Sequence, residues 1–467
     1  MFFTMVSSIK SFFNLNSIQQ KHSLLKSLVL LGLVLFMLYT LLFSHHYQPP
    51  NLLAIHKQKR PVSRSVTNSP TNLSDIMFGI VGSVKTWKHK RSYVESWWRP
   101  NVTRGYVFLD REPSQEFLPW SSNSPPFRVN RNITKSKLYP KIVNPIQIRI
   151  VHTILETFRE GDKDVKWYVM ADDDTVLFID NLVEVLAKYD HTKYFYIGEN
   201  SECIRSNSDF SFDMAFGGAG YALSYALMEV LATKLDGCIE RYPHLHSSDF
   251  ILHACLADLG VALTHEKGFH QIDLRGDISG LLSAHNSDRP LVSLHHIDII
   301  DPIFSSKNRS ESVTHLMKAY KLDHSRLLQQ TICYHRPSNW SFSISWGYST
   351  HIYETIFPQS FLQKPLETFR PWMKYAKPPF YIFNTRGISN NPCETPHEFF
   401  FDSMEISSED QIVTTYVRIS PRQRNRSRCF STGNHSADSI TRIQVFSPAA
   451  TPKKVSPNPN SNSLLLV

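Results

Sequence analysis

Three consecutive aspartates near the middle of the chain are the residues best suited to chemistry. Asp172, Asp173 and Asp174 directly follow Trp167–Ala171, an apolar segment with the composition of a buried strand. Ligands of α/β proteins bind at the carboxyl ends of strands. Adjacent carboxylates repel one another, and a hard divalent cation that carries a diphosphate would neutralise them. The triplet therefore predicts a metal site.

Two other interpretations of the triplet stay open. Asp174 or Thr175 could cap a helix expected to begin near Ile179, although a cap accounts for one carboxylate and not for three. The Asp-x-Asp spacing that starts at Asp172 also fits the nucleophile loop of haloacid-dehalogenase-type phosphatases. Those enzymes need a later lysine and a downstream acidic pair, for which the chain has no convincing match. The metal site is the favoured interpretation.

Three further motifs follow the triplet along the chain. Residues 216–221 (FGGAGY) predict a glycine-rich turn between the last central strand and a helix, where a ligand can approach the backbone closely. Asp249 stands at the expected start of a helix, and without further context an N-cap is the favoured role. His295 and His296 end an apolar run, and a histidine there could complete a metal shell, although such pairs are more often structural.

The segments around these motifs alternate between strands and helices. With 467 residues and 42% hydrophobic content, the chain is globular and long enough for a large core. Period-two and helical spacing of apolar residues predict strands at 76–82, 105–109, 167–171 and 194–197, and helices at 87–98, 142–158, 179–188, 224–235 and 249–259. This alternation predicts an α/β layer with a largely parallel sheet.

The pattern changes after about residue 327. From Trp340 to Tyr348 large apolar residues alternate with serine and glycine, which predicts a strand with one apolar face. Further strands are expected at 380–383, 412–419 and 440–446. We therefore expect a mainly β C-terminal unit at 327–446, which could be a lid or an acceptor-binding module, and a disordered tail at 447–467.

The N-terminal part predicts a membrane anchor. Residues 27–43 form an uncharged, mostly apolar run at the short end of a bilayer span. A cleaved signal peptide is the alternative, but its apolar part usually has about 7–15 residues and ends at a small-residue site. Lys21 and Lys26 favour a cytoplasmic tail at 1–26 by the positive-inside rule. Residues 44–75, rich in Pro, Ser, Asn and basic residues, predict a stem.

Other sequence features indicate the secretory pathway. N-x-Ser/Thr sequons occur only beyond the predicted anchor, as expected for a glycosylated lumenal body. The 6 cysteines have no C-x-x-C spacing, which argues against zinc; they could form disulfides whose pairing the sequence does not reveal. The net charge of +9 lies largely outside the expected folded region, without a nucleic-acid motif, so nucleic acid is not an expected partner.

The order of the motifs resembles the fringe-like enzymes of glycosyltransferase family 31. An acidic triplet, Gly-Gly-Ala-Gly, Ser-Asp and Leu-His-His follow one another as they do there. Residues 167–175 are similar to the Trp-Phe-x-x-Ala-Asp-Asp-Asp-Thr of core-1 β-1,3-galactosyltransferases. HEKGFHQIDLRG from His265 and SISWGY from Ser343 most resemble the plant fringe-related family. The resemblance covers about 76–446.

The resemblance implies a GT-A fold at 76–326, a UDP-sugar donor, Mn2+ and inversion at the anomeric carbon. It makes Asp174 and His295 the metal ligands, with His296 as the alternative if the alignment shifts by one residue. Asp249 matches the catalytic Asp, although the family's acidic pair has only one carboxylate here. The nucleotide sugar is expected beside two aspartates and the glycine-rich turn: Asp172, Asp173, Gly217, Gly218, Ala219 and Gly220.

These implications define the expected function. A type II protein of the Golgi membrane would move a hexose or N-acetylhexosamine from a UDP-sugar to a hydroxyl of a glycan or glycoprotein, in β-1,3 linkage. A carboxylate would remove the acceptor proton, and a metal would stabilise the charge of the departing UDP. The alternative is a catalytically silent relative, a membrane-anchored glycan-binding protein or folding helper for other transferases. The intact acidic triplet argues against it.

Overall fold

The described part of the chain falls into two units. The computed structural model describes residues 29–39, 70–133, 142–285, 289–407, 411–418, 429, 436–449 and 464–466. Contacts divide the chain into Met1–Ser69 and Pro70–Val467. Only 29–39 is described in the first unit, as an exposed helix.

The membrane anchor expected at 27–43 stays a prediction. Within the described ranges, no helix is both long enough and apolar enough to cross a membrane. The described helix at 29–39 covers the middle of the expected anchor, and its ends lie outside the described residues. The expected tail at 1–26 and nearly all of the expected stem lie outside them too.

A mixed sheet forms the centre of the α/β layer. It has 7 strands in the order β3-β2-β1-β4-β7-β6-β8. Its strands are β1 (Ile76–Val81), β2 (Arg104–Leu109), β3 (Phe127–Val129), β4 (Trp167–Asp172), β6 (Tyr196–Gly198), β7 (Tyr221–Ser224) and β8 (Leu263–His265). Every neighbouring pair is parallel except the two that involve β7. The predicted α/β layer with a largely parallel sheet is confirmed.

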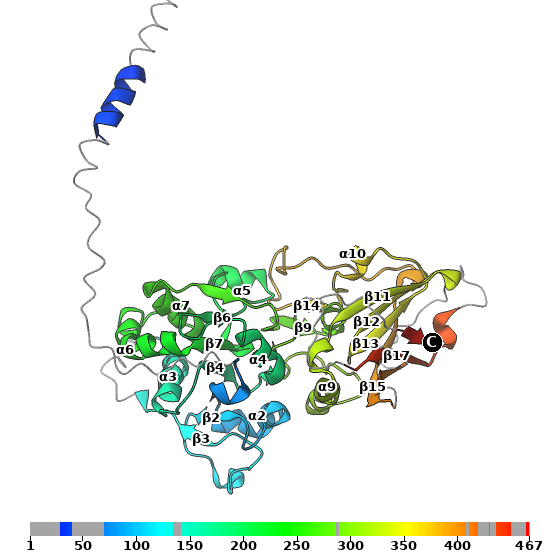
Figure 1. Ribbon diagram of the computed structural model, residues 1–467, viewed down its shortest axis with the longest axis horizontal. Coiled ribbons are helices and arrows are strands. Elements are labelled where there is room, and N and C mark those ends of the chain that lie inside the picture. Colours follow the sequence, from blue (N-terminus) through cyan, green and yellow to red (C-terminus); the bar gives the residue numbers. More distant parts are fainter. Residues whose placement is uncertain are drawn as a thin grey trace, which may run out of the picture. The chain divides into compact units, whose positions relative to one another are not determined.

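Helices cover both faces of this sheet (Figure 1). They are α2 (Val84–Trp97) and α4 (Ile179–Leu186) on one face and α3 (Pro145–Arg159), α6 (Tyr225–Arg241) and α7 (Ser248–Asp258) on the other. The further helices before the C-terminal sheet are α5 (Ile204–Asp209), α8 (Ser279–Leu282) beside β14 (Phe369–Pro371), and α9 (Arg309–Leu322), which packs against α2 and β15 (His397–Ile406). Alternate residues of β4 supply two separate cores, because successive side chains of a strand point to opposite faces. Trp167 and Val169 pack with α2 and α4, whereas Tyr168 and Met170 pack with α3, α6 and α7.

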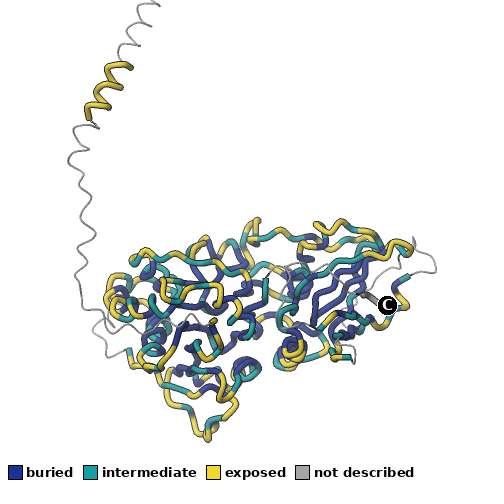
Figure 2. Tube along the Cα trace, viewed as in Figure 1, coloured by how far each residue is buried: buried dark blue, intermediate teal, exposed yellow. Residues whose placement is uncertain are grey.

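A second sheet follows in the C-terminal part, which we define as residues 330–448. It has 7 strands in the order β11-β12-β13-β15-β16-β17-β18, and all neighbours are antiparallel. The strands are β11 (Gln330–His335), β12 (Trp340–Ser345), β13 (Ser349–Tyr353), β15 (His397–Ile406), β16 (Gln411–Arg418), β17 (Arg442–Pro448) and, beyond that part, β18 (Leu464–Leu466). The central strands of both sheets, such as β1, β4, β12 and β13, are buried (Figure 2). The expected domain boundaries stay a prediction.

Two strand predictions in the C-terminal part are corrected. The alternating run from Trp340 to Tyr348 is not one strand, because Gly347 adopts φ +71° in a turn between β12 and β13. Three-residue hairpin loops favour glycine at such a left-handed position. Residues 380–383 form no strand; Tyr381 makes only an isolated bridge to Cys203. Neither turn nor bridge changes the apolar pattern, so the sequence did not reveal them.

Short strand pairs connect distant segments. β5 (Val176–Leu177) pairs with β10 (Ser293–Leu294), and β9 (Leu274–Gly276) pairs with β14 (Phe369–Pro371). The second pair lies between the two large sheets (Figure 1). The first pair places the segment after the acidic triplet beside the segment before His295.

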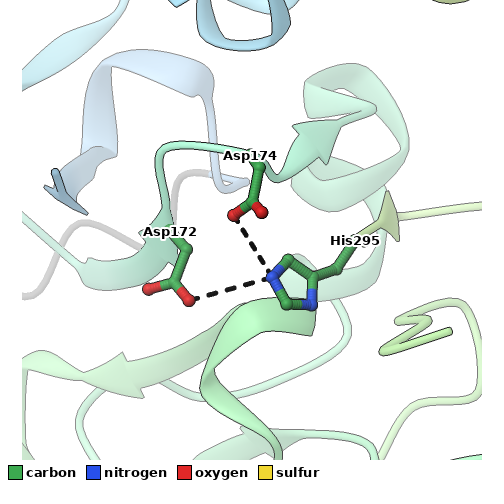
Figure 3. A group of neighbouring side chains, drawn as sticks. All are labelled: Asp172, Asp174 and His295. Carbon is green, nitrogen blue, oxygen red and sulfur yellow. Dashed lines mark ion pairs between the residues drawn. The ribbon is translucent and has the colours of Figure 1, made fainter. Parts of the chain in front are cut away.

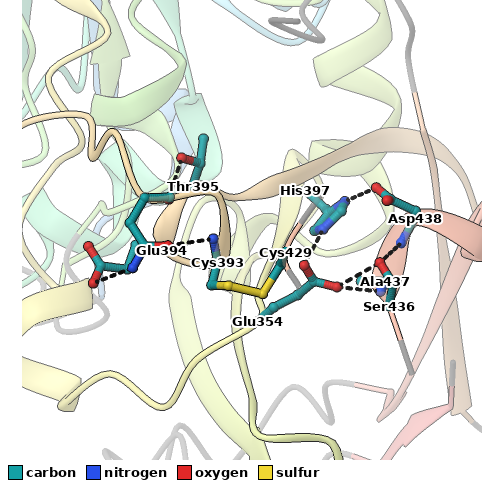
Figure 4. Close-up of a disulfide and its surroundings, with 10 residues drawn as sticks. Glu354, Cys393, Glu394, Thr395, His397, Cys429, Ser436, Ala437 and Asp438 are labelled. Carbon is teal, nitrogen blue, oxygen red and sulfur yellow. Dashed lines mark hydrogen bonds and ion pairs between the residues drawn. A yellow bond between two sulfur atoms is a disulfide. The ribbon is translucent and has the colours of Figure 1, made fainter. Parts of the chain in front are cut away.

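The cysteines form two disulfides. Cys238–Cys255 joins α6 to α7, and Cys393–Cys429 closes a loop in the C-terminal part (Figure 4). Cys203 and Cys333 are free thiols. Because the partners of both disulfides are set by the fold, spacing along the sequence did not identify them.

Candidate active site

The acidic triplet lies at the carboxyl end of β4, the central strand of the seven-stranded sheet. A tight turn holds it there. The backbone N–H of Asp172 donates to Thr175 Oγ1 at 3.0 Å, and that hydroxyl donates to the carbonyl of Gly218 at 2.7 Å. Helix α4 begins only at Ile179, with Phe178 as its N-cap and no side-chain cap. The interpretation of Asp174 or Thr175 as a helix cap is therefore wrong.

Pairing of β5 with β10 brings His295 to two of the aspartates. Its Nε2 atom lies 3.2 Å from Asp174 Oδ1 and 3.8 Å from Asp172 Oδ2 (Figure 3). One ligand atom from each residue lies within 4.8 Å of the others. Asp174 and His295 are buried, whereas Asp172 is half-buried, so the cluster is most accessible on the Asp172 side. Two carboxylates and an imidazole suit a divalent cation such as Mn2+.

His296 points away from this cluster. Its Nδ1–H donates to the carbonyl of Ile272 at 3.2 Å and lies 3.4 Å from Asp273 Oδ1. Its ring stacks on Trp372, with 4.6 Å between the centroids. Of the two histidines singled out in the sequence, the structure brings His295 to the aspartates and gives His296 other partners.

Asp173 belongs to a different set of contacts. Its Oδ2 accepts a hydrogen bond from Thr86 Oγ1 of α2 at 3.2 Å, and its Oδ1 lies 3.3 Å from Lys90 Nζ. Burial raises the pKa of Asp173 to about 6, and the ammonium of Lys90 opposes that rise. Asp173 therefore faces α2 rather than the cation cluster.

Lys90 is a functional candidate that the sequence analysis missed. Its Nζ donates to Asp174 Oδ2 at 2.8 Å and lies 4.0 Å from Asp298 Oδ2. The only signal was a basic stretch on the predicted helix, and no spacing separates Lys90 from Lys85, Lys88 or Arg91. The tertiary contact between α2 and the end of β4 selects it.

The electrostatics of the cluster require positive charge. Burial acts to raise the pKa of Asp174, but His295 and Lys90 together hold it well below its usual range. Burial acts to lower the pKa of His295, yet Asp174 and Asp172 raise it to about 8. The carboxylates thus keep a proton on the imidazole when no cation is bound, and a divalent cation would take over that role.

The glycine-rich turn lies in a different place from the one expected. Gly217–Ala219 form a short 3-10 turn that precedes β7, so it does not lie between a strand and a helix. A Cβ on Gly218 would lie 2.1 Å from His295 Cε1, and one on Gly217 would lie 2.4 Å from Asp249 Oδ1. The His295 side chain occupies the space beside Gly218, and the Asp249 side chain occupies the space beside Gly217.

Ala219 and Gly220 complete the turn through their backbone. Ala219 donates its N–H to Gln271 Oε1 at 2.8 Å, and its carbonyl accepts from Ser293 Oγ at 2.5 Å. Gly220 has φ +84°, a conformation that other residues rarely adopt. The turn is thereby held against β10, which leads to His295.

Asp249 faces the same turn and caps nothing. The N-cap of α7 is Ser247, and Asp249 lies within the first turn of the helix. The interpretation of Asp249 as an N-cap is therefore wrong. Its Oδ1 accepts from Ser248 Oγ at 3.2 Å, and burial raises its pKa against a hydrogen bond from the Gly217 backbone. Gly217 contacts Asp249, and its neighbour Gly218 contacts His295. The Asp249 carboxyl group, whose pKa is raised, therefore lies beside the cation cluster.

Two family models match the chain. One described as "Fringe-like" matches residues 71–286, and one described as "Protein of unknown function, DUF604" matches residues 206–462. Asp172 and Asp174 lie in the first match, and His295 lies in the second alone.

Similar proteins include two curated transferases and a solved structure. The beta-1,3-glucosyltransferases of Mus musculus and Homo sapiens are each 30% identical over 119 residues, which is 25% of this chain and 23% of theirs. The chain thus matches about a quarter of their length. The structure of galactosyltransferase LgtC with donor and acceptor sugar analogues is 10% identical with a TM-score of 0.30, covering 45% of this chain and 78% of that one.

Proposed function

Since this chain belongs to the DUF604 family and carries a Fringe-like domain, we propose that it is an inverting, metal-dependent glycosyltransferase with a GT-A fold. It moves a hexose or N-acetylhexosamine from a UDP-sugar to a hydroxyl of a glycan or glycoprotein, in β-1,3 linkage. The observation that carries the proposal is the cluster of Asp172, Asp174 and His295 beside Asp249. The partial match to beta-1,3-glucosyltransferases supports the linkage type.

Asp172, Asp174 and His295 hold the divalent cation in this proposal, with Mn2+ as the expected ion. A cation bound there supplies charge stabilisation to the diphosphate of the departing UDP. Lys90 supplies a second positive charge, 2.8 Å from Asp174 Oδ2. Thr86 and Lys90 keep Asp173 on the side of α2. The buried position of Asp174 and His295 keeps bulk water away from the charges.

Asp249 is the general base. Its carboxylate removes the proton of the acceptor hydroxyl while that oxygen bonds to the anomeric carbon. The bond from this carbon to the UDP oxygen breaks, and UDP leaves with the electron pair. A raised pKa brings the carboxylate closer to the range in which general bases work best. A single base on the face opposite the leaving group inverts the configuration.

We further propose a type II arrangement in the Golgi membrane, with 27–43 as the anchor and the second unit in the lumen. Two disulfides support this location because disulfides persist in oxidising compartments. Sequons beyond the anchor support it as well. Protease treatment of sealed vesicles should remove an N-terminal tag while the lumenal body stays protected. A tag that is protected while the body is digested would overturn this topology.

A screen of UDP-sugars tests the proposed activity. The full chain in detergent should release UDP from at least one sugar donor, and chelation of divalent cations should abolish this release. Asp174→Asn serves as the inactive reference. Mn2+-dependent UDP binding without any release or transfer would indicate a catalytically silent relative instead. Release of phosphate from a phosphate monoester would indicate the phosphatase alternative.

A further inference from the structure

Packing, rather than a second hydrogen bond, fixes the His295 imidazole. Its Nε2 atom faces Asp172 and Asp174, while its buried Nδ1 atom has no hydrogen-bond partner among the described residues. Metal-binding histidines usually donate the second ring nitrogen to a carboxylate or carbonyl, which fixes the ring. Here the ring contacts Gly218 and the ring of His296, with 4.0 Å between the two imidazole centroids. The position of the His296 ring therefore affects the orientation of the His295 ring.

His296 is held in a strained conformation. Its φ is +54°, and Ile272, which accepts the hydrogen bond from its ring, also has φ +54°. A left-handed conformation is uncommon for histidine and a genuine outlier for a β-branched residue. Such strain persists only where the surroundings enforce it, and it is concentrated at functional sites. The contacts of the His296 ring thus help to hold its backbone in the left-handed conformation.

The C-terminal part supplies one of these contacts. Trp372 follows β14 directly and stacks on His296, with 4.6 Å between centroids and 10° between the ring planes. Pairing of β14 with β9 fixes the backbone that leads to Trp372. Arg275 of β9 donates its Nε–H to the Trp372 carbonyl at 2.8 Å, and its guanidinium lies 4.3 Å from the ring centroid. The indole is therefore anchored to β9.

We propose that Trp372 is a positioning residue of the metal site, which acts through His296 to aim the Nε2 atom of His295 at Asp172 and Asp174. The proposal rests on the proposed function, because it presupposes a cation at this cluster. Trp372 lies outside the Fringe-like match and inside the DUF604 match. The C-terminal part thus supports a metal site whose two aspartates lie in the Fringe-like match, which gives this part a role beyond stability.

Mn2+ affinity of the full chain, measured by electron paramagnetic resonance without nucleotide, tests this role. Trp372→Ala should weaken Mn2+ binding about 10–100-fold, as loss of an outer contact to a metal ligand typically does. Trp372→Phe keeps a stacking ring and should retain most of the affinity. Tyr375→Ala is the matched control, because this nearby aromatic residue is 88% exposed. The thermal unfolding midpoint, recorded in parallel, separates loss of metal affinity from loss of fold.

A second variant keeps the test decisive if Trp372→Ala unfolds the protein. His296→Asn removes the ring, while asparagine tolerates the left-handed backbone better than most residues. It should weaken Mn2+ binding to a similar degree, and adding Trp372→Ala should weaken it little further, because both residues act through one contact. Mn2+ affinity equal to wild type in His296→Asn, or in a folded Trp372→Ala, would overturn the proposal.

The reference variants separate the two proposals. If wild type binds Mn2+ and Asp174→Asn does not, while Trp372→Ala binds like wild type, only the positioning role fails. If wild type binds no Mn2+, the metal site itself fails, and the positioning role fails with it.

Discussion

The α/β layer and the C-terminal sheet both bury charged side chains, but they balance the charges differently. At the end of β4, the positive partners in close contact with Asp172, Asp173 and Asp174 are, among the residues that the structure describes, Lys90 and His295. The imidazole carries its charge there only because the aspartates raise its pKa to about 8. Three carboxyl groups face two cationic groups here, burial raises the pKa of Asp172 to about 7, and the cluster is accessible on the Asp172 side.

The C-terminal sheet shows the opposite arrangement. Glu354 accepts hydrogen bonds from Ala437 N at 2.7 Å and Ser436 Oγ at 2.9 Å, and lies 3.5 Å from His397 Nε2 (Figure 4). Arg418 Nη1 lies 3.1 Å from His397 Nδ1. Both oxygens of the Glu354 carboxylate have partners within the chain, and the residue is only 2% exposed.

The difference separates a binding site from a structural network. A buried charge is costly unless it is paired, so an unbalanced, accessible cluster indicates a charged ligand, and a balanced, enclosed one indicates stability. Substitutions in the first cluster should therefore change binding and catalysis, and those in the second should change the free energy of unfolding.

The largest effect is expected for Asp174→Asn. The variant keeps the size of the side chain but removes a charge from the cation cluster. Transfer should fall by about 10³-fold or more, since a bound metal contributes several kcal/mol of charge stabilisation. Calorimetry with Mn2+ and UDP should show lost binding, while the thermal midpoint stays close to that of wild type. Wild-type Mn2+ affinity would contradict the assignment of Asp174 as a ligand.

Asp249→Asn should lower turnover by at least about 100-fold, because it removes the proton acceptor. The affinity for the donor should stay nearly unchanged, since the lost interaction exists mainly in the transition state. Asp258→Asn, at the other end of α7 and exposed to solvent, is the control. Turnover close to wild type in a folded Asp249→Asn variant would place the base elsewhere.

Lys90→Met should have opposite effects on two ligands. Mn2+ alone should bind up to about tenfold more tightly, because a competing positive charge leaves Asp174. The affinity for UDP should fall, because a charge near the diphosphate is lost. Lys88→Met on the same helix is the control, since its Nζ lies 3.8 Å from Glu116 and is solvent-exposed. If Mn2+ binds more weakly to the Lys90 variant, Lys90 does not compete for Asp174.

Glu354→Gln should leave turnover unchanged and act on stability alone. Loss of the charge beside His397 should lower the free energy of unfolding by about 1–3 kcal/mol. Chemical denaturation combined with a transfer assay measures both quantities. A change in Mn2+ affinity for this variant would show that the two clusters are coupled, and the contrast between them would no longer hold.

Local sequence pattern predicted the strands, helices and site residues that do not depend on long-range pairing. Apolar periodicity identified β4, α3 and α7. The order of motifs predicted Asp174 and His295 as metal ligands, which the structure brings together, and put Asp172 beside the nucleotide sugar, whereas the structure places it in the same cluster. These signals are strong because strand and helix periods differ and because the triplet is contiguous.

Long-range pairing determines the rest. The register of β5 with β10 places His295 rather than His296 at the aspartates, a choice that the resemblance left open to a shift of one residue. Lys90 reaches the site from α2, and Trp372 contacts His296 from the segment after β14. Both contacts depend on the tertiary fold, so no local sequence pattern predicted them. Asp249 was favoured as an N-cap because helix starts are known only to within a few residues from sequence, whereas the structure starts α7 one residue earlier.

Anomalous diffraction from a crystal of the protein with Mn2+ and UDP tests the central claim most directly. A single strong manganese peak should lie within bonding distance, about 2.0–2.6 Å, of carboxylate oxygens of Asp172 and Asp174 and of His295 Nε2. The diphosphate of UDP should contact the same ion, with Asp249 facing the sugar side. A peak at other residues, or UDP bound without any ion at this cluster, would contradict the account.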